Sequence, residues 1–554
     1  MTNVFKLFGL SLFIILMLSF CTKEADLNKA QELITEDGIM QHIRALAHDS
    51  MMGRAPATEG ERKTVEYLIR EFEEMGLQGG MPDGGFIQEV PVVSQTTQPG
   101  SVMQITRGNQ TLHRLNHFTD MMAWPAAGQE EVSIRDAELV YVGYGIVAPE
   151  EDWDDFKGQD MSGKILVFKN SDPYTYPEKF AGTARLYYGR WSYKYEIAQE
   201  LGALGAIVMH TLPTAGYGWN VVSGSWARPR FALESEMADS ETQLNAWLTH
   251  HYSREIFESA GLDLDEMMDA AESPDFEPVP LEGLRLSIDL KATYDSLTLK
   301  NVLALLPGND DSLNDEYVIF SAHHDHLGSG MAVEGDSIFN GAVDNASGTG
   351  AMLEVARAFK SVQPHLRRNV LFTAVGGEES GLLGSRHLAN NSPVPVGKIS
   401  ANFNLDSTNM AGETEDIIVV GKGRTTIDEY MLEEAEKVGR TVVPDQQPEQ
   451  GFYYRSDHFS FARVGIPAYY PSAGVNYKGE ADDYFQEVIL PHRQYIYHTV
   501  HDETDKIMSM AGATADMRLL FNVAYRVVNA DEMQQWLPGD EFEAARMKAI
   551  EEAN

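Results

Sequence analysis

Residues 317–326 read YVIFSAHHDH, and the rest of the chain is interpreted outward from this stretch. It begins as an apolar run that is typical of a buried strand and ends in histidines and an aspartate. Two later runs have the same form, because residues 369–375 lead into Gly-Gly-Glu-Glu at 376–379 and residues 398–405 lead into Asp406. Apolar runs that each end in metal-binding side chains predict ligands at one edge of a sheet.

A helical pattern lies between the first two of these runs. Residues 348–362 place Met352, Val355, Ala356 and Phe359 on one face. Strands that alternate with helices predict an α/β fold with a doubly wound, mostly parallel sheet. In such sheets ligands bind at the carboxyl ends of the strands, where three of the polar segments fall.

Five separated segments together carry enough ligands for two metal ions. They are residues 321–326, 341–345, 377–380, 404–407 and 497–502. Imidazole and carboxylate are zinc ligands, and two metals that share a bridging carboxylate polarise one water. A further glutamate beside them is available as a base. The pattern predicts a two-metal hydrolase.

These segments, together with the loop at residues 49–54, resemble the co-catalytic zinc aminopeptidases, a family that includes bacterial leucyl aminopeptidases and the yeast vacuolar aminopeptidase, aminopeptidase Y. The resemblance implies two Zn²⁺ per chain and a zinc exopeptidase-like fold. It implies that His323 and Asp406 hold one zinc, that His498 and Glu379 hold the other, and that Asp344 bridges them.

The same resemblance implies the remaining roles in catalysis. Glu378 would be the general base, and Asp325 would orient His323, as metal-bound histidines usually require. Asp502 is expected to do the same near His498. Tyr497 matches a position at which some members of the family place a phenol that donates to the oxyanion, whereas other members have an aliphatic residue there.

Other polar residues lie close to the motifs in sequence. We expect His324, His326 and His501 to have loop or supporting roles, since they match no ligand position. Arg455 and Asp457 resemble a cleft-lining segment of the family, and both substrate contact and a purely structural role remain open for them.

The expected activity is hydrolysis of the N-terminal peptide bond of peptides with a free N-terminus. Three alternatives remain: a carboxypeptidase of the glutamate carboxypeptidase type, a glutaminyl cyclase that uses a single zinc on the same fold, and a non-catalytic peptide-binding lipoprotein. The net charge of −40 argues against nucleic acid as a partner, because phosphates require basic side chains. Residue specificity and oligomeric state are not readable from the sequence.

Composition shifts along the chain predict its domain organisation. Residues 22–110 form the N-terminal part of the catalytic domain, residues 294–530 its main part, and residues 531–554 an acidic tail or helix. Residues 111–293 are expected to form an inserted β-rich α+β domain that resembles a protease-associated domain.

The first 21 residues are typical of a lipoprotein signal peptide. Lys6 precedes an apolar run at residues 7–20, and Cys21, the only cysteine of the chain, follows it directly. The run is shorter than the roughly 20 residues of a membrane span. We therefore expect export, with a lipidated Cys21 as the only link to the membrane of a bacterial cell envelope; a signal that is simply cleaved and an uncleaved anchor remain as alternatives.

Overall fold

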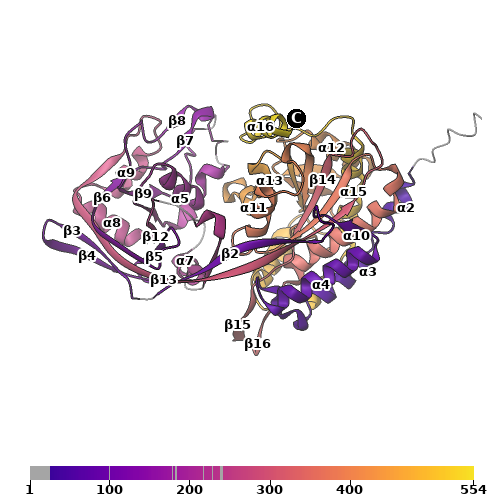
Figure 1. The fold of residues 1–554 in the computed structure, drawn as a ribbon, viewed down its shortest axis with the longest axis horizontal. Coiled ribbons are helices and arrows are strands. Elements are labelled where there is room, and N and C mark those ends of the chain that lie inside the picture. The colour runs from indigo at the N-terminus through magenta and orange to yellow at the C-terminus, as the bar shows by residue number, and fades with distance from the viewer. Residues whose placement is uncertain are drawn as a thin grey trace, which may run out of the picture.

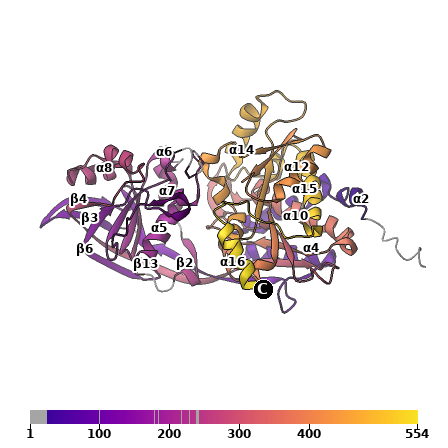
Figure 2. The same cartoon turned by 90° about the horizontal axis from the view of Figure 1, so that it is seen from above.

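The chain forms two lobes that are joined by two long paired strands (Figure 1). The computed structural model describes residues 25–553 apart from 99, 177–178, 181, 183, 216–217, 227–228 and 238–240. Strand β2 (Ile87–Thr97) runs antiparallel to β13 (Val279–Leu306), and these two strands connect the lobes. Figure 2 shows the same separation from above.

The larger lobe contains a mixed, mostly parallel sheet in the order β13–β17–β14–β18–β21. Strands β17, β14, β18 and β21 are parallel, and β13 joins β17 antiparallel. Beyond β21 the sheet continues with antiparallel β19 and then β20. The strands that follow β13 are β14 (Tyr317–His323), β17 (Asn369–Val375), β18 (Ile399–Asn404), β19 (Asp416–Val420), β20 (Thr441–Pro444) and β21 (Ala468–Ala473).

The central strands are covered on both faces, since every residue of β17 and β18 and all but the first residue of β14 are buried. In β14, Val318 and Phe320 belong to one hydrophobic core while Ile319 belongs to another. This alternation is the period of two expected of a strand between two layers. The predicted doubly wound α/β fold is therefore confirmed.

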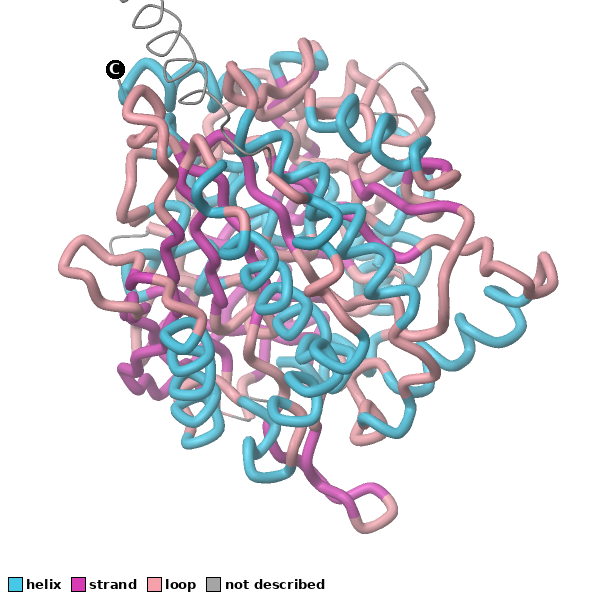
Figure 3. The backbone as a smooth tube through the Cα atoms, turned by 90° about the vertical axis from the view of Figure 1, so that its right-hand side faces the viewer, coloured by secondary structure: helices cyan, strands magenta, loops and turns pink. Residues whose placement is uncertain are grey.

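Helices cover the two faces of this sheet (Figure 3). The larger core is closed by α3 (Glu36–Leu46), α4 (Glu59–Glu74), α10 (Gly348–Ser361), α12 (Ile427–Lys437) and α15 (Ala511–Asn529). The opposite face packs against α11 (Leu383–Asn390) and α13 (His458–Arg463). The amino-terminal helices begin where the sequence supplies caps, since Thr35 and Thr58 accept hydrogen bonds from the backbone of the first turns of α3 and α4.

Two short elements of the larger lobe lie close to the predicted site. A hairpin of β15 (Gly328–Val333) and β16 (Asp336–Phe339) projects from the lobe (Figure 1). Helix α14 (Leu490–Ile496) leads directly into the last predicted ligand segment. Both elements begin or end within a few residues of a candidate ligand.

The smaller lobe has a core of its own, built from residues between Met103 and Leu290. Its sheet runs in the order β4–β3–β13–β6–β9–β10–β12–β5 and so shares β13 with the larger lobe. The other strands are β3 (Val102–Arg107), β4 (Gln110–Asn116), β5 (Met121–Pro125), β6 (Glu131–Tyr141), β9 (Ile165–Lys169), β10 (Gly205–Met209) and β12 (Leu244–Leu248). The helices are α5 (Trp191–Glu200), α6 (Leu212–Ala215), α7 (Trp219–Trp226), α8 (His250–Ser259) and α9 (Leu264–Ala270). The expected boundaries at 111 and 293, and the likeness to a protease-associated domain, stay predictions.

The smaller lobe also packs directly against the larger one. The backbone N–H of Arg185 donates to the carbonyl of Pro448 at 3.1 Å. The ring of Tyr187 lies 5.2 Å from that of Phe459 on α13. The lobes are thus in contact away from their two connecting strands.

The two ends of the chain differ in what the structure describes. Helix α16 (Glu543–Ala553) packs on the larger lobe, where Arg546 is buried and donates to the carbonyl of Ile399 at 2.8 Å. The predicted signal peptide and Cys21 lie outside the described residues. Within the described residues, no helix combines the length and apolarity needed to traverse a bilayer.

Candidate metal centre

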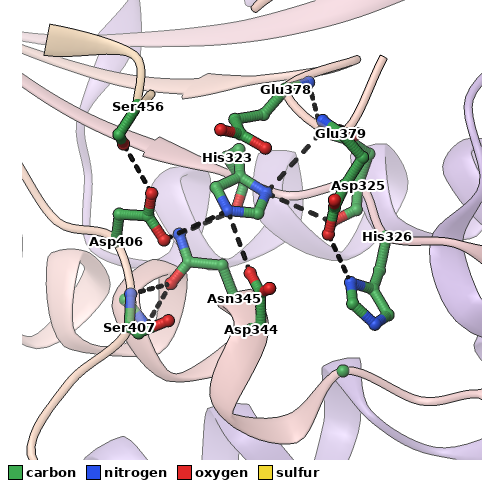
Figure 4. Close-up of polar contacts among 12 residues, drawn as sticks. His323, Asp325, His326, Asp344, Asn345, Glu378, Glu379, Asp406, Ser407 and Ser456 are labelled. Carbon is green, nitrogen blue, oxygen red and sulfur yellow. Dashed lines mark hydrogen bonds and ion pairs between the residues drawn. The ribbon is translucent and has the colours of Figure 1, made fainter. Parts of the chain in front are cut away.

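His323 ends strand β14 and points into a group of carboxylates (Figure 4). Its Nε2 lies 3.3 Å from Oδ1 of Asp344 and 3.4 Å from Oδ1 of Asp406. Asp406 comes two residues after β18, the parallel neighbour of β14, so the sheet itself brings these side chains together. The His323 side chain is 1% exposed, and the group is therefore closed to bulk solvent on that side.

His498 approaches Asp344 from the other side. Its Nε2 lies 3.1 Å from Oδ2 of Asp344 and 3.1 Å from Oε2 of Glu379. Glu379 follows β17. Asp344 therefore lies between the two histidines and directs one carboxylate oxygen to each.

His326, for which the sequence suggested a loop or supporting role, contacts a candidate ligand directly. Its Nδ1 lies 2.7 Å from Oε1 of Glu379, and it forms a second potential metal group with Glu379 and Asp344. Its Nε2 is buried without a hydrogen-bond partner among the described residues. Gly341 makes room for this ring, since a Cβ there would stand 2.6 Å from Cδ2 of His326. The sequence feature that could have drawn attention to His326 is its place as the third histidine of residues 323–326, HHDH.

The loop that carries Asp344 is fixed by buried side chains. Asp502 accepts hydrogen bonds from the backbone N–H of Val343 at 2.8 Å and of Asp344 at 2.9 Å. These bonds hold the segment Ala342–Ser347 that carries Asp344, the bridging loop, whereas the sequence suggested a role for Asp502 beside His498. Asn345 donates to the carbonyls of His323 and Leu405, and so it ties the same loop to two strand ends.

Asp406 is oriented by residues from outside the ligand set. The hydroxyl of Ser456 donates to Oδ2 of Asp406, and the hydroxyl of Tyr470 donates to its backbone carbonyl at 3.2 Å. Oδ1 remains directed at His323. Oδ2 of Asp406 is thus held by Ser456, while Oδ1 faces the candidate metal site.

Glu378 and Asp325 lie on the side of the site nearest β17. The side chain of Glu378 lies beside the His323 ring (Figure 4). Burial, together with the charges of Glu379 and Asp406, raises the pKa of Glu378 well above its usual range, although His323 opposes the shift. A carboxyl group in such surroundings is suited to accept and hold a proton.

Asp325 is fully buried and holds two segments together. Its carboxylate accepts from the backbone N–H of Glu378 at 3.1 Å and of Glu379 at 3.4 Å. Nδ1 of His323 lies 3.3 Å from the backbone carbonyl of Asp325 and 3.8 Å from its carboxylate. Asp325 therefore fixes the position of the Glu378–Glu379 turn as well as lying behind His323.

The pKa values of His498 and Glu379 are shifted by the opposite charges that face them in the candidate centre. Burial lowers the pKa of His498, but Glu379 and Asp344 outweigh it and raise that pKa to about 10. Burial and Asp344 would raise the pKa of Glu379, whereas His498 and His326 bring it to about 2. Carboxylates that attract positive charge this strongly, with imidazole nitrogens among them, match the donor set of divalent zinc.

The remaining candidate residues lie around this centre. The side chain of Tyr497 is 61% exposed, and its ring stacks on that of His498 with centroids 3.8 Å apart. Asp457 is fully buried, and burial raises its pKa to about 7. The guanidinium of Arg455 lies 5.4 Å from the ring of Phe452.

The two other motif histidines point elsewhere. Nε2 of His324 lies 2.9 Å from the carbonyl of Lys300. The ring of His501 stacks on Tyr495 with centroids 4.5 Å apart. Both rings therefore pair with groups outside the candidate ligand set.

Comparison with known proteins matches the part of the chain that carries this centre. Residues 301–521 match the sequence model of Peptidase family M28, and this range includes every candidate ligand from His323 to His498. Aminopeptidase YwaD from Bacillus subtilis (strain 168) is 31% identical over 188 residues, which are 32% of this chain and 36% of that protein.

Other relatives match over shorter or more divergent stretches. A probable zinc metalloprotease from Pyrenophora teres f. teres (strain 0-1) is 37% identical over 111 residues, 20% of this chain and 23% of that protein. The chain thus spans well under half the length of these curated relatives. Among solved structures, an aminopeptidase from Aneurinibacillus sp. strain AM-1 aligns with 90% of this chain and 95% of its own, at 20% identity and a TM-score of 0.48.

Proposed function

We propose that this chain is a two-zinc exopeptidase that removes amino acids from the N-terminus of peptides. The observation that carries the proposal is Asp344, whose two carboxylate oxygens face His323 and His498 respectively. One zinc would be held by His323, Asp344 and Asp406, and the other by His498, Asp344 and Glu379. The match of residues 301–521 to Peptidase family M28 supports the same reading.

When bound, the two ions would polarise the scissile carbonyl and favour ionisation of a water. The protein's own contribution is to move the proton. Glu378 would accept it from the water and pass it to the departing amine, and its enclosed position beside His323 supports this role. Tyr497 would donate a hydrogen bond to the developing oxyanion, since its exposed ring lies against His498.

The substitution Glu378→Gln tests the base. We expect turnover of an aminoacyl p-nitroanilide to fall by roughly 10²–10⁴-fold, the usual contribution of general base catalysis, while two zinc ions per chain remain bound. Glu354, buried on α10 and paired with Arg357 at 3.0 Å, supplies a control carboxylate: Glu354→Gln should leave turnover of the folded protein near wild type. Wild-type activity in Glu378→Gln would exclude Glu378 as the base.

Three substrates assayed in parallel separate the proposal from its alternatives. An aminoacyl p-nitroanilide reports an aminopeptidase, an N-blocked peptide with a C-terminal glutamate reports a carboxypeptidase, and a peptide with N-terminal glutamine reports cyclisation. Turnover of only the first is expected. A protein that takes up no zinc and turns over none of them would be a binding protein.

We further propose that the chain is exported and anchored through a lipid on Cys21. The support is the sequence alone, in which the only cysteine follows an apolar run directly. Expression in a bacterium that processes lipoproteins should place the protein in the membrane fraction and label it with a fatty-acid probe. Cys21→Ser should abolish labelling, and an unlabelled wild-type protein would contradict the anchor.

A further inference from the structure

Arg54 is buried beneath the candidate metal centre but belongs to a distant part of the sequence. It ends the short helical turn η1 (Asp49–Arg54) between α3 and α4 and is 1% exposed. Within the described residues, the side chain of Arg54 forms no ion pair with a carboxylate. A buried guanidinium that forms no direct ion pair must be satisfied by other acceptors.

Those acceptors are backbone carbonyls, and most of them belong to the ligand-bearing segments. Nε donates to the carbonyl of His324 at 2.9 Å, directly after His323. Nη1 donates to Asn340 at 2.6 Å and Nη2 to Gly341 at 2.9 Å, shortly before Asp344. One planar side chain therefore ties the end of β14 to the start of the bridging loop.

A fourth bond links this arrangement to the helical layer. Nη1 also donates to the carbonyl of Leu46 at 2.9 Å, at the end of α3. In the opposite direction, the carbonyl of Arg54 accepts from the backbone N–H of His326 at 3.4 Å. Both the side chain and the backbone of Arg54 thus contact the segment that carries His323 and His326.

The backbone around Arg54 is held in an uncommon conformation. Met52, Gly53 and Arg54 have φ values of 54°, 66° and 51°, and such angles are costly for residues other than glycine. A Cβ on Gly53 would lie 2.4 Å from the carbonyl oxygen of Gly328 and 2.6 Å from that of Phe339. The turn is therefore wedged against the base of the β15–β16 hairpin.

The charge of Arg54 also interacts with the carboxylates around the candidate centre. Burial lowers its pKa to about 10, while Asp502, Asp325 and Asp344 oppose that shift. The guanidinium therefore remains positively charged at neutral pH. Because its hydrogen bonds go to backbone carbonyls, it leaves the carboxylate oxygens of the site available to a metal.

We propose that Arg54 is a positioning residue that sets the spacing between His323 and Asp344 through its bonds to His324, Asn340 and Gly341, and thereby sets the zinc affinity of the centre. This inference rests on the proposed two-zinc centre and deepens it. Lysine retains the charge but lacks the planar fork of donors. Arg54→Lys therefore separates the hydrogen-bond geometry from the charge.

The test compares Arg54→Lys with a matched control at a second buried arginine. Arg546 is also 1% exposed, also donates to backbone carbonyls, and also has a pKa lowered to about 10 by burial, but it belongs to α16 and bonds Ile399 and Gln534 instead of the ligand-bearing segments. We expect both lysine variants to melt below wild type. Competition with a chromophoric chelator should show zinc bound roughly 10–100-fold more weakly by Arg54→Lys, the usual cost of losing a partner behind a ligand, and unchanged by Arg546→Lys.

Gly53→Ala provides a second variant if Arg54→Lys fails to fold. It leaves the guanidinium in place but drives a methyl group against the carbonyl of Gly328, and weaker zinc binding is again expected. Wild-type zinc affinity in the folded Arg54→Lys protein, or in Gly53→Ala if only that variant folds, overturns the proposal. Equal loss in Arg546→Lys also overturns it, because a generally loosened fold would then explain the result.

Peptidase activity gives an independent readout. Excess zinc should restore the turnover of Arg54→Lys, since none of its lost bonds involves the base Glu378. If wild-type protein binds zinc but cleaves no peptide, the proposed function fails while the comparison of zinc affinities still decides the role of Arg54.

Discussion

Nδ1 of His326 lies 2.7 Å from Oε1 of Glu379, while the other oxygen of that carboxylate lies 3.1 Å from Nε2 of His498. One oxygen of Glu379 is thus held by the buried ring of His326. The other oxygen faces the half-buried ring of His498, on the side of Asp344. Residues behind a metal ligand fix its orientation and raise its affinity. The arrangement gives the expected supporting role of His326 a specific partner, Glu379, which its sequence position alone did not reveal.

Replacing His326 by leucine should weaken binding of the zinc that Glu379 and His498 share. We expect a loss of roughly 10–100-fold at one site, with the site of His323 and Asp406 less affected. Stepwise zinc titration followed by isothermal calorimetry would resolve the two events. His324→Leu is the matched control, because His324 is equally buried but contacts the carbonyl of Lys300; identical loss in both variants would contradict the assignment.

The strand ends were predictable from sequence because β14 and β17 are largely apolar, and because β18, with the sequence ISANFN, alternates with helices in the same pattern. Each strand ends at or shortly before a candidate ligand, so the predicted strands and the metal-binding residue types agreed at His323, Glu379 and Asp406. Parallel pairing aligns His323 with Val375 and Ser321 with Asn404, and that alignment makes separated motifs adjacent. The α/β alternation predicted that these segments meet at one edge of the sheet, while the role of each residue came from the family resemblance.

The partners of the supporting residues were not predictable, because these partners are backbone atoms from distant segments. Arg54 bonds carbonyls some 270 to 287 positions away, and a carbonyl has no signature in sequence. Asp502 similarly binds two N–H groups of the bridging loop, although its proximity to His498 in sequence suggested that histidine. Such bonds depend on how loops fold over the sheet, which local patterns do not encode.

Asp502→Asn should destabilise the bridging loop. An amide has one acceptor oxygen where the carboxylate offers two, so either the N–H of Val343 or that of Asp344 loses its partner. A buried donor without a partner costs about 1–3 kcal/mol. Urea unfolding of the zinc-free protein would measure this loss. An unchanged unfolding free energy would mean that the loop is held without Asp502.

Stability should fall with acid in part because of His458. This side chain is fully buried between Tyr453 and Tyr470, and burial together with Arg424 lowers its pKa from 6.5 to about 3. As the pH falls, His458 is therefore protonated near pH 6.5 in the unfolded chain but only near pH 3 in the folded protein. The stabilisation is present above pH 6.5 and is lost as the pH falls through that window, by up to about 1.4 kcal/mol per pH unit.

The variant His458→Phe isolates this contribution. Its unfolding free energy should differ from that of wild type by a constant above pH 7 and should improve relative to wild type between pH 6.5 and pH 4. Urea unfolding of both proteins at a series of pH values gives the difference directly. Parallel curves across the whole range would show that His458 does not titrate on unfolding.

Removal of metal should destabilise the larger lobe far more than the smaller one. Without cations, Asp344, Glu379 and Asp406 face one another with only imidazoles between them, whereas the core of the smaller lobe has no ligand of the centre in it. A ligand that binds only the folded state adds about 2.7 kcal/mol at a hundredfold excess over its Kd. Calorimetry after chelation should therefore show a lowered transition that zinc restores in a concentration-dependent way, and hydrogen exchange should localise the change to β14 and the bridging loop. If neither the chelator nor added zinc changed the melting temperature, the result would contradict a metal centre at Asp344.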